Sequence, residues 1–74
     1  LLAVRQEAVQ FAGQAQAELD SHKKEWERSK KKAVKEILGK LKRTLYKVPP
    51  EKITADSAAV IRDLQEELQR ALNS

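Results

Sequence analysis

The sequence predicts an all-α protein: a long amphipathic helix over residues 1–48, a Pro-Pro turn over 49–54 and a shorter amphipathic helix over 55–74. Charged residues make up 35% of the chain, and much of the rest is Ala, Leu and Gln, a composition typical of long helices and coiled coils. No Pro precedes residue 49, so one continuous helix is permitted before it. The chain has only one Trp, one Tyr and one Phe to fill a core, so we expect a coiled-coil or helical-bundle oligomer.

The first predicted helix is expected to form an elongated rod. An uninterrupted helix of that span is about 70 Å long at 1.5 Å per residue, too long for the interior of a compact small domain. Apolar residues recur along it every eleven positions, as in the row Val4, Ala15, Trp26, Ile37 and Val48. A strict heptad fits only from Val34 onward, so we expect nearly straight or weakly right-handed packing.

The apolar stripe of this helix differs between its two halves. Ala8, Ala12 and Ala15 in the first half bring helices close but bury little area. The large residues of the second half each contribute about 1.5–3 kcal/mol when fully buried, so we expect the second half to hold an assembly together and the first to fray. Lys23 and Lys30 interrupt the stripe. Either their stems cover the apolar seam while the ammonium groups reach water, or they form a polar layer that selects register.

A proline pair ends the first helix. Pro49 has no amide proton and disfavours the helical conformation for Val48 before it. Thr54 is the expected N-cap of the second helix, with Asp56 near the positive end of its dipole. An earlier start, with Pro50 as the first helical residue, is the alternative. The apolar stripe of the second helix consists of Ile61, Leu64, Leu68 and Leu72.

Charge is distributed unevenly along the chain, whose formal net charge is +4. Residues 23–47 hold eleven basic residues against three acidic ones, a net charge of +8, whereas residues 1–22 and 48–74 each carry −2. This acidic–basic–acidic order favours an antiparallel or staggered association in which the flanking segments lie against the basic block. The basic surface is expected to include Lys30, Lys31, Lys32, Lys35, Lys42 and Arg43.

The chain lacks residues with the spacing of an active site, a metal site or a phosphate-binding loop. Its one histidine, His22, lies beside acidic residues on a polar helix and is interpreted as a surface residue. The absence of Cys excludes disulfides and thiolate metal sites and favours a reducing compartment. No apolar run reaches membrane-spanning length. We expect a cytoplasmic protein that is not an enzyme and holds no cofactor or metal; its start at Leu1 suggests a piece of a longer chain.

Trp26 lies on the apolar stripe between Lys23 and Lys30. It has two interpretations: packing within a core, or anchoring a partner, because Trp is enriched among interface hot spots. The residues expected to bind a partner helix are Trp26, Val34, Ile37, Leu38, Leu41, Leu45, Ile61, Leu64, Leu68 and Leu72.

The basic block supports a second hypothesis, nucleic-acid binding. Lys-rich helices bind phosphate without sequence specificity and with a steep salt dependence. Against this, the block has few aromatic side chains to stack on bases and lacks the Asn/Arg pattern of zipper-type basic regions. No membrane partner is expected either, since the bulky apolar face of an interfacial helix is missing.

The block Trp26–Val48, followed by the Pro-Pro break and an acidic-leaning helix, resembles a segment of the long coiled-coil scaffold proteins of the centrosome, of the Asterless-type pericentriolar group. The resemblance lies in a Lys/Glu/Gln/Ala-rich helix with a Leu stripe, and it covers the whole chain. It implies binding of partner helices within a larger scaffold of the centrosome or cytoskeleton. The function expected from the sequence is a structural protein–protein interaction and oligomerisation module that acts by helix–helix association, with itself or with a heteromeric coiled-coil partner. The alternative is a basic helical nucleic-acid-binding segment.

Overall fold

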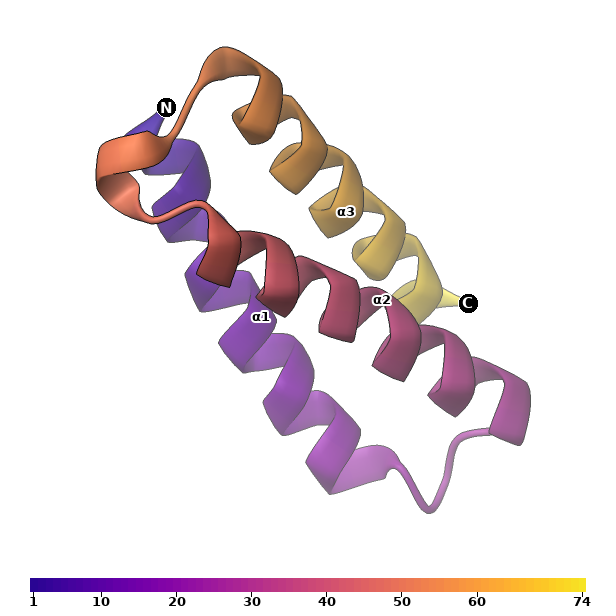
Figure 1. Cartoon of the computed structure of the whole chain (residues 1–74). Coiled ribbons are helices and arrows are strands. Elements are labelled where there is room, and N and C mark those ends of the chain that lie inside the picture. Colours follow the sequence, from indigo (N-terminus) through magenta and orange to yellow (C-terminus); the bar gives the residue numbers. More distant parts are fainter.

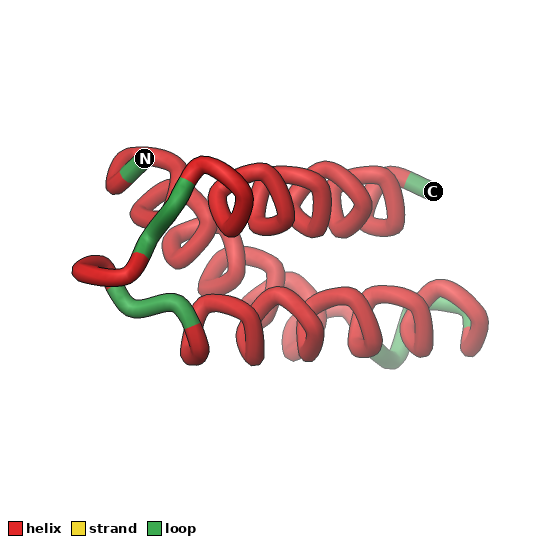
Figure 2. Tube along the Cα trace, turned by 45° about the horizontal axis from the view of Figure 1, so that its top comes forward, coloured by secondary structure: helices red, strands yellow, loops and turns green.

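Three α-helices form the computed structural model, which describes all 74 residues. α1 spans Leu2–His22, α2 spans Arg28–Lys47 and α3 spans Ala55–Asn73, with the short 3-10 helix η1 at Pro50–Lys52 before α3. Each helix packs on both of the others in a bundle of 39 × 17 × 17 Å. The N-terminus and η1 lie at one end, and the C-terminus and the α1–α2 turn lie at the other (Figure 1). Figure 2 shows that loops only join helix ends, which confirms the all-α prediction.

The prediction of one helix over residues 1–48 is wrong, because the chain reverses direction between α1 and α2. α1 ends at His22, whose carbonyl accepts from the amides of both Glu25 at 2.8 Å and Trp26 at 3.1 Å in the turn that follows. Glu27 then adopts an extended conformation, with φ −60° and ψ 152°, and α2 restarts after it. The reversal places the large apolar residues of α2 against the alanines of α1 in the same chain. The elongated rod is therefore replaced by a bundle 39 Å long.

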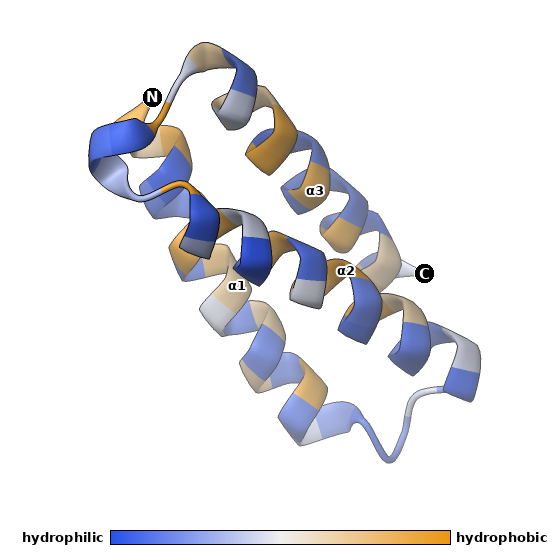
Figure 3. Cartoon of the chain, viewed as in Figure 1, coloured by the Kyte–Doolittle hydropathy of each residue, from blue (hydrophilic) through white to orange (hydrophobic).

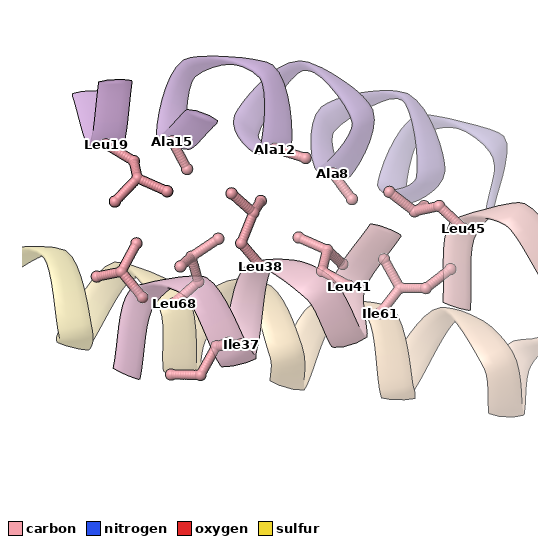
Figure 4. Packing of buried hydrophobic residues seen from close by; sticks show 11 residues of the cluster. Ala8, Ala12, Ala15, Leu19, Ile37, Leu38, Leu41, Leu45, Ile61 and Leu68 are labelled. Atoms are coloured by element: carbon pink, nitrogen blue, oxygen red, sulfur yellow. The ribbon is translucent and has the colours of Figure 1, made fainter. Parts of the chain in front are cut away.

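The core is one apolar cluster to which all three helices contribute. Colouring the ribbon by hydropathy shows apolar and polar positions alternating along each helix (Figure 3), and the close-up shows the apolar side chains meeting between the helices (Figure 4). The cluster consists of Ala8, Ala12, Ala15, Leu19, Val34, Ile37, Leu38, Leu41, Leu45, Ile61 and Leu68. The three helices of one chain therefore cover the apolar stripes of one another, and burying these stripes requires no second chain.

The alanine half of α1 is buried as deeply as the leucine half of α2. Ala8 is 0% exposed and Ala15 is 1% exposed, the same range as Leu41. Leu38 and Leu41 point toward this alanine face (Figure 4). The small side chains of α1 thus leave room for the large side chains of α2. This arrangement packs the interior closely without large aromatic residues. The alanine half of the stripe is thus part of the core, although each alanine buries less area than a leucine; that this half frays more easily stays a prediction.

The second chain reversal follows the proline pair. Val48 and Pro49 leave the helical conformation, and the 3-10 turn leads to Thr54, which is extended. Thr54 is the N-cap of α3: its Oγ1 accepts from the Ser57 amide at 3.1 Å, while the Thr54 amide donates to Ser57 Oγ at 2.9 Å. This reciprocal capping box satisfies two amides that a helix start leaves without partners. The predicted N-cap is confirmed.

Arg5 joins the start of α1 to the end of α2. Its Nε donates to the Val48 carbonyl at 2.8 Å and its Nη2 donates to the Leu45 carbonyl at 3.2 Å. Leu45 lies in the last turn of α2 and Val48 is its C-cap, where a helix lacks internal donors and carries the negative end of its dipole. The guanidinium therefore caps α2 from a neighbouring helix, at a part-buried position that water screens incompletely.

We predict that Ala8→Glu lowers the free energy of unfolding by about 3 kcal/mol or more, because it places an unpaired carboxylate at a position that is fully buried in the core. Ala17→Glu on the exposed face of the same helix is the matched control, and it should change stability by less than about 0.5 kcal/mol. Urea denaturation followed by circular dichroism measures both. Equal effects of the two substitutions would show that α1 does not pack through its alanine face.

We also predict that Arg5→Ala destabilises the bundle by about 1.5–3 kcal/mol, since two charge-assisted hydrogen bonds to backbone carbonyls are lost. Arg5→Lys should recover only part of this loss, because an ammonium group lacks the planar fork that reaches both carbonyls. Arg62→Ala, at an exposed position on α3, serves as the control. Thermal unfolding curves for the three variants decide the point, and full recovery by lysine would contradict it.

Candidate interaction surface

Most residues predicted to bind a partner helix lie inside the bundle. Leu64 and Leu72 are partly buried and pack against the core. The others are fully buried: Val34, Ile37, Leu38, Leu41, Leu45, Ile61 and Leu68. These side chains are unavailable to another chain while the bundle is closed. A partner of the closed bundle must therefore meet a different surface.

Trp26 lies at the turn between α1 and α2, half-buried against the core. The Lys30 ammonium is 4.7 Å from the centroid of its ring, and the His22 ring stacks on it with centroids 6.4 Å apart. Lys30 Nζ also donates to the Ser74 carbonyl at 3.0 Å. Trp26 thus closes one end of the bundle, which agrees with the packing interpretation of this residue. Lys30 lies over the apolar ring with its ammonium near the surface, while Lys23 is exposed.

A cavity of about 560 Å³ adjoins this turn. Its lining mixes charges of both signs, with Glu25 and Glu27 beside Lys30, and the Lys30 ammonium is already engaged by the Trp26 ring and a carbonyl. His22 Nδ1 also contacts Glu25 Oε2 here, at 3.4 Å. A surface whose charges are locally balanced and occupied offers little to a charged partner.

The charge on α2 is different, because none of it is ion-paired within the chain. α2 carries nine basic residues and one acidic residue, Glu36. None of the nine has a carboxylate within ion-pair distance. The acidic flanking segments do lie against the basic block, since α1 and α3 both pack on α2. Their carboxylates, however, form no ion pair with the basic side chains of α2. Uncompensated charges of one sign on one helix produce a positive potential that attracts an anionic partner.

Part of this charge is aligned along one line of the helix surface. Residues at spacings of four and three lie on one face of a helix. The residues that follow this spacing on the outer face of α2 are Arg28, Lys32, Lys35, Gly39, Lys42 and Tyr46, and we call them the α2 stripe. All except the half-buried Gly39 are exposed, and the stripe is about 27 Å long. Lys42 Nζ donates to Gln16 Oε1 of α1 at 2.6 Å, so the stripe lies beside α1.

A shallow groove of about 340 Å³ lies between α1 and α2 at the Tyr46 end of the stripe. Val9 is 45% exposed and Tyr46 is 88% exposed, so two large hydrophobic side chains meet solvent here. A Cβ added at Gly13 would meet no atom within 4 Å, so the groove is open above this residue. The lining consists of Arg5, Val9, Ala12, Gly13, Lys42, Leu45 and Tyr46. We call it the α1–α2 groove; it combines an apolar floor with two cationic side chains.

The structure thus retains part of the predicted basic surface and adds residues that sequence reasoning missed. Lys32, Lys35, Lys42 and Arg43 are exposed, while Lys30 and Lys31 are half-buried. The groove residues Val9, Gly13 and Tyr46 were not singled out, because they belong to different helices that only the chain reversal brings together. One signal was present: the four–three spacing from Arg28 to Tyr46 marks a second helix face, opposite the apolar one.

No family model, curated protein or solved structure matches this chain. None of its three helices combines the length and the apolar character needed to cross a membrane.

We predict that Gly13→Ala stabilises the protein by about 0.5–1 kcal/mol, because a helix-interior glycine loses more backbone entropy on folding than alanine and the new methyl group enters open space. Gly39→Ala is the matched comparison. A Cβ there would lie 3.3 Å from Arg43 Nη1, so its gain should be smaller. Denaturant titrations of both variants test this, and destabilisation by Gly13→Ala would contradict the open groove.

Proposed function

We propose that this chain is a non-enzymatic three-helix binding module that associates with an acidic amphipathic helix of another protein along the α2 stripe and the α1–α2 groove. The observation that carries the proposal is the set of nine basic residues on α2, none of which forms an ion pair with a carboxylate of the chain, beside an apolar groove. Helix–helix association, the mode expected from the sequence, is kept, but the surface proposed for it is the outer face of α2.

The chemistry of the groove supports a helix as the partner. An amphipathic helix places an apolar residue in a hydrophobic groove and further residues three, four and seven positions along. The space above Gly13, between Val9 and Tyr46, suits one apolar anchor. From there, carboxylates at the same helical spacing would follow Lys42, Lys35 and Lys32 along the α2 stripe. Such charges mainly raise the association rate and determine orientation, while the apolar anchor slows dissociation.

Nucleic-acid binding is the second candidate, because a basic stripe about 27 Å long also suits a phosphate backbone. The groove distinguishes the two candidates. Its exposed Val9 and open Gly13 give a helix an apolar contact, and they give phosphates nothing. Tyr46 is the only aromatic side chain on the stripe, so base stacking has a single platform. The larger centrosomal or cytoskeletal scaffold implied by the resemblance remains a proposal of the same kind.

A direct test uses a synthetic helical peptide of about three heptads with Leu at the a and d positions and Glu elsewhere. We expect it to bind with a dissociation constant in the micromolar range and to shift the amide resonances of Val9, Gly13 and Tyr46 in ¹H–¹⁵N spectra. Gly13→Leu, which fills the groove, should weaken binding at least tenfold. Lys52→Ala, outside the stripe on η1, should leave it unchanged.

Two further ligands distinguish an acidic helix from nucleic acid as the partner. The same peptide with Lys in place of Glu should not bind, and duplex DNA at physiological salt should bind more weakly than the acidic peptide. Resonance shifts confined to α3 would contradict the proposed surface. Tight binding of duplex, with a steep loss as salt rises, would favour the nucleic-acid function instead.

A further inference from the structure

The turn between α1 and α2 lacks the local signals that normally end a helix. Residues 23–27 contain no Gly or Pro, and no residue of the chain has a positive φ. Lys23 is still helical, with φ −58° and ψ −28°, and its amide donates to the Leu19 carbonyl at 2.9 Å. The His22 carbonyl then accepts from two amides, that of Glu25 three residues on and that of Trp26 four residues on. α1 therefore ends at His22, residues 23–26 form a turn without a helix breaker, and Glu27 is extended before α2 begins.

The start of α2 is also weakly encoded. Glu27 occupies the N-cap position without any side-chain hydrogen bond to the exposed amides, and the first turn contains no acidic residue. Arg28, Lys30 and Lys31 instead place positive charge at the positive end of the helix dipole, which is unfavourable. α3 shows the contrast, with a full capping box and Asp56 in its first turn. The α2 start is therefore held by tertiary packing and not by its own sequence.

A continuous helix through this turn would remove the two unfavourable features of the α2 start, its uncapped amides and its basic residues at the positive end of the dipole. The amides of the first α2 turn would find helical carbonyls, and the basic residues would lie in a helix interior. Asp20 and Lys24, and Glu27 and Lys31, would become pairs four residues apart with the acidic residue first, the favourable orientation. The eleven-residue row also continues across the turn without a shift, through Trp26.

A single chain would lose stability in this continuous helix, because α1 would leave the core. Its alanine face would then be exposed to water, as would Leu38 and Leu41 of α2. A second copy supplies the identical surface. We infer that two chains exchange α1: in each, α1 and α2 merge into one helix about 69 Å long, and its α1 part packs on α2 and α3 of the other chain. This exchange restores every contact of the closed bundle except the turn. It is independent of the partner proposed for the α2 stripe.

The test uses a cross-link that reports which chain supplies α1. The chain has no Cys, so Gln16→Cys with Lys42→Cys introduces the only two thiols. The two native side chains, from α1 and α2, meet at 2.6 Å. The protein is annealed at millimolar concentration by heating through unfolding and cooling, and dimers are isolated by size exclusion with light scattering. A short bis-maleimide should link the two thiols within one chain in monomers and between chains in dimers.

Glu27→Pro distinguishes the closed monomer from the exchanged dimer, because proline suits the first and disfavours the second. The φ of −60° at Glu27 suits proline, and the Glu27 amide donates no hydrogen bond, so the closed bundle tolerates the change. In the continuous helix a proline removes a hydrogen bond and clashes with the preceding turn, so dimerisation should weaken at least about a hundredfold. Glu27→Ala, which removes the same carboxylate, should keep the dimer. Because proline also restricts Trp26, insertion of Gly-Ser-Gly after Glu25 provides a second variant with the same expected loss of dimer.

Three results would overturn the inference. The first is a wild-type chain that remains monomeric after annealing. The second is a dimer whose cross-links all lie within single chains, which indicates a surface contact without exchange. The third is a dimer that the proline variant and the glycine insertion form as readily as Glu27→Ala.

Discussion

The structure depends on the close antiparallel contact between the alanine face of α1 and the leucine face of α2. Ala8 and Ala15 leave room for Leu38 and Leu41 to enter from the other side, so the two helices approach closely (Figure 4). α3 then covers the remaining apolar surface with Ile61 and Leu68, both 0% exposed. A bundle of such helices reaches a dense interior with few aromatic residues, since interlocking small and large aliphatic side chains fill the space.

This contact also determines which face of α2 meets solvent. Once its apolar residues are committed to α1 and α3, the basic residues must point outward. The acidic residues of α1 and α3, such as Glu18 and Glu67, are themselves exposed and form no ion pair with α2. Burial of the apolar stripe and exposure of an uncompensated positive face are therefore two consequences of one packing arrangement.

The sequence predicted the features that depend on local chemistry. Pro49 marked the end of α2, Thr54 marked the N-cap of α3, and the apolar positions from Val34 to Leu45 marked residues that are buried. It did not predict the turn after His22, because residues 23–27 carry no helix breaker and the eleven-residue row runs through them. Only the contact between distant side chains favours that turn, and a pattern along one chain does not report it.

The candidate interaction surface also has a part that the sequence predicted and a part that it did not. Lys32, Lys35 and Lys42 were predicted to be basic surface residues because their positions avoid the apolar stripe. The groove was not, since Val9 and Tyr46 become neighbours only after the reversal. A site made by one helix follows from periodicity, whereas a site made between two helices requires their relative placement.

The two proposals also fit together geometrically. In the exchanged dimer each α2 would still pack beside an α1, supplied by the other chain, and residues such as Val9 and Lys42 would meet across the two chains as they do within one. The groove and the α2 stripe would then be present twice on one particle. A partner with two acidic helices could engage both at once, and its second contact would form at the high effective concentration that linkage provides. Exchange would thus change the number of binding surfaces on a particle while leaving the chemistry of each one unaltered.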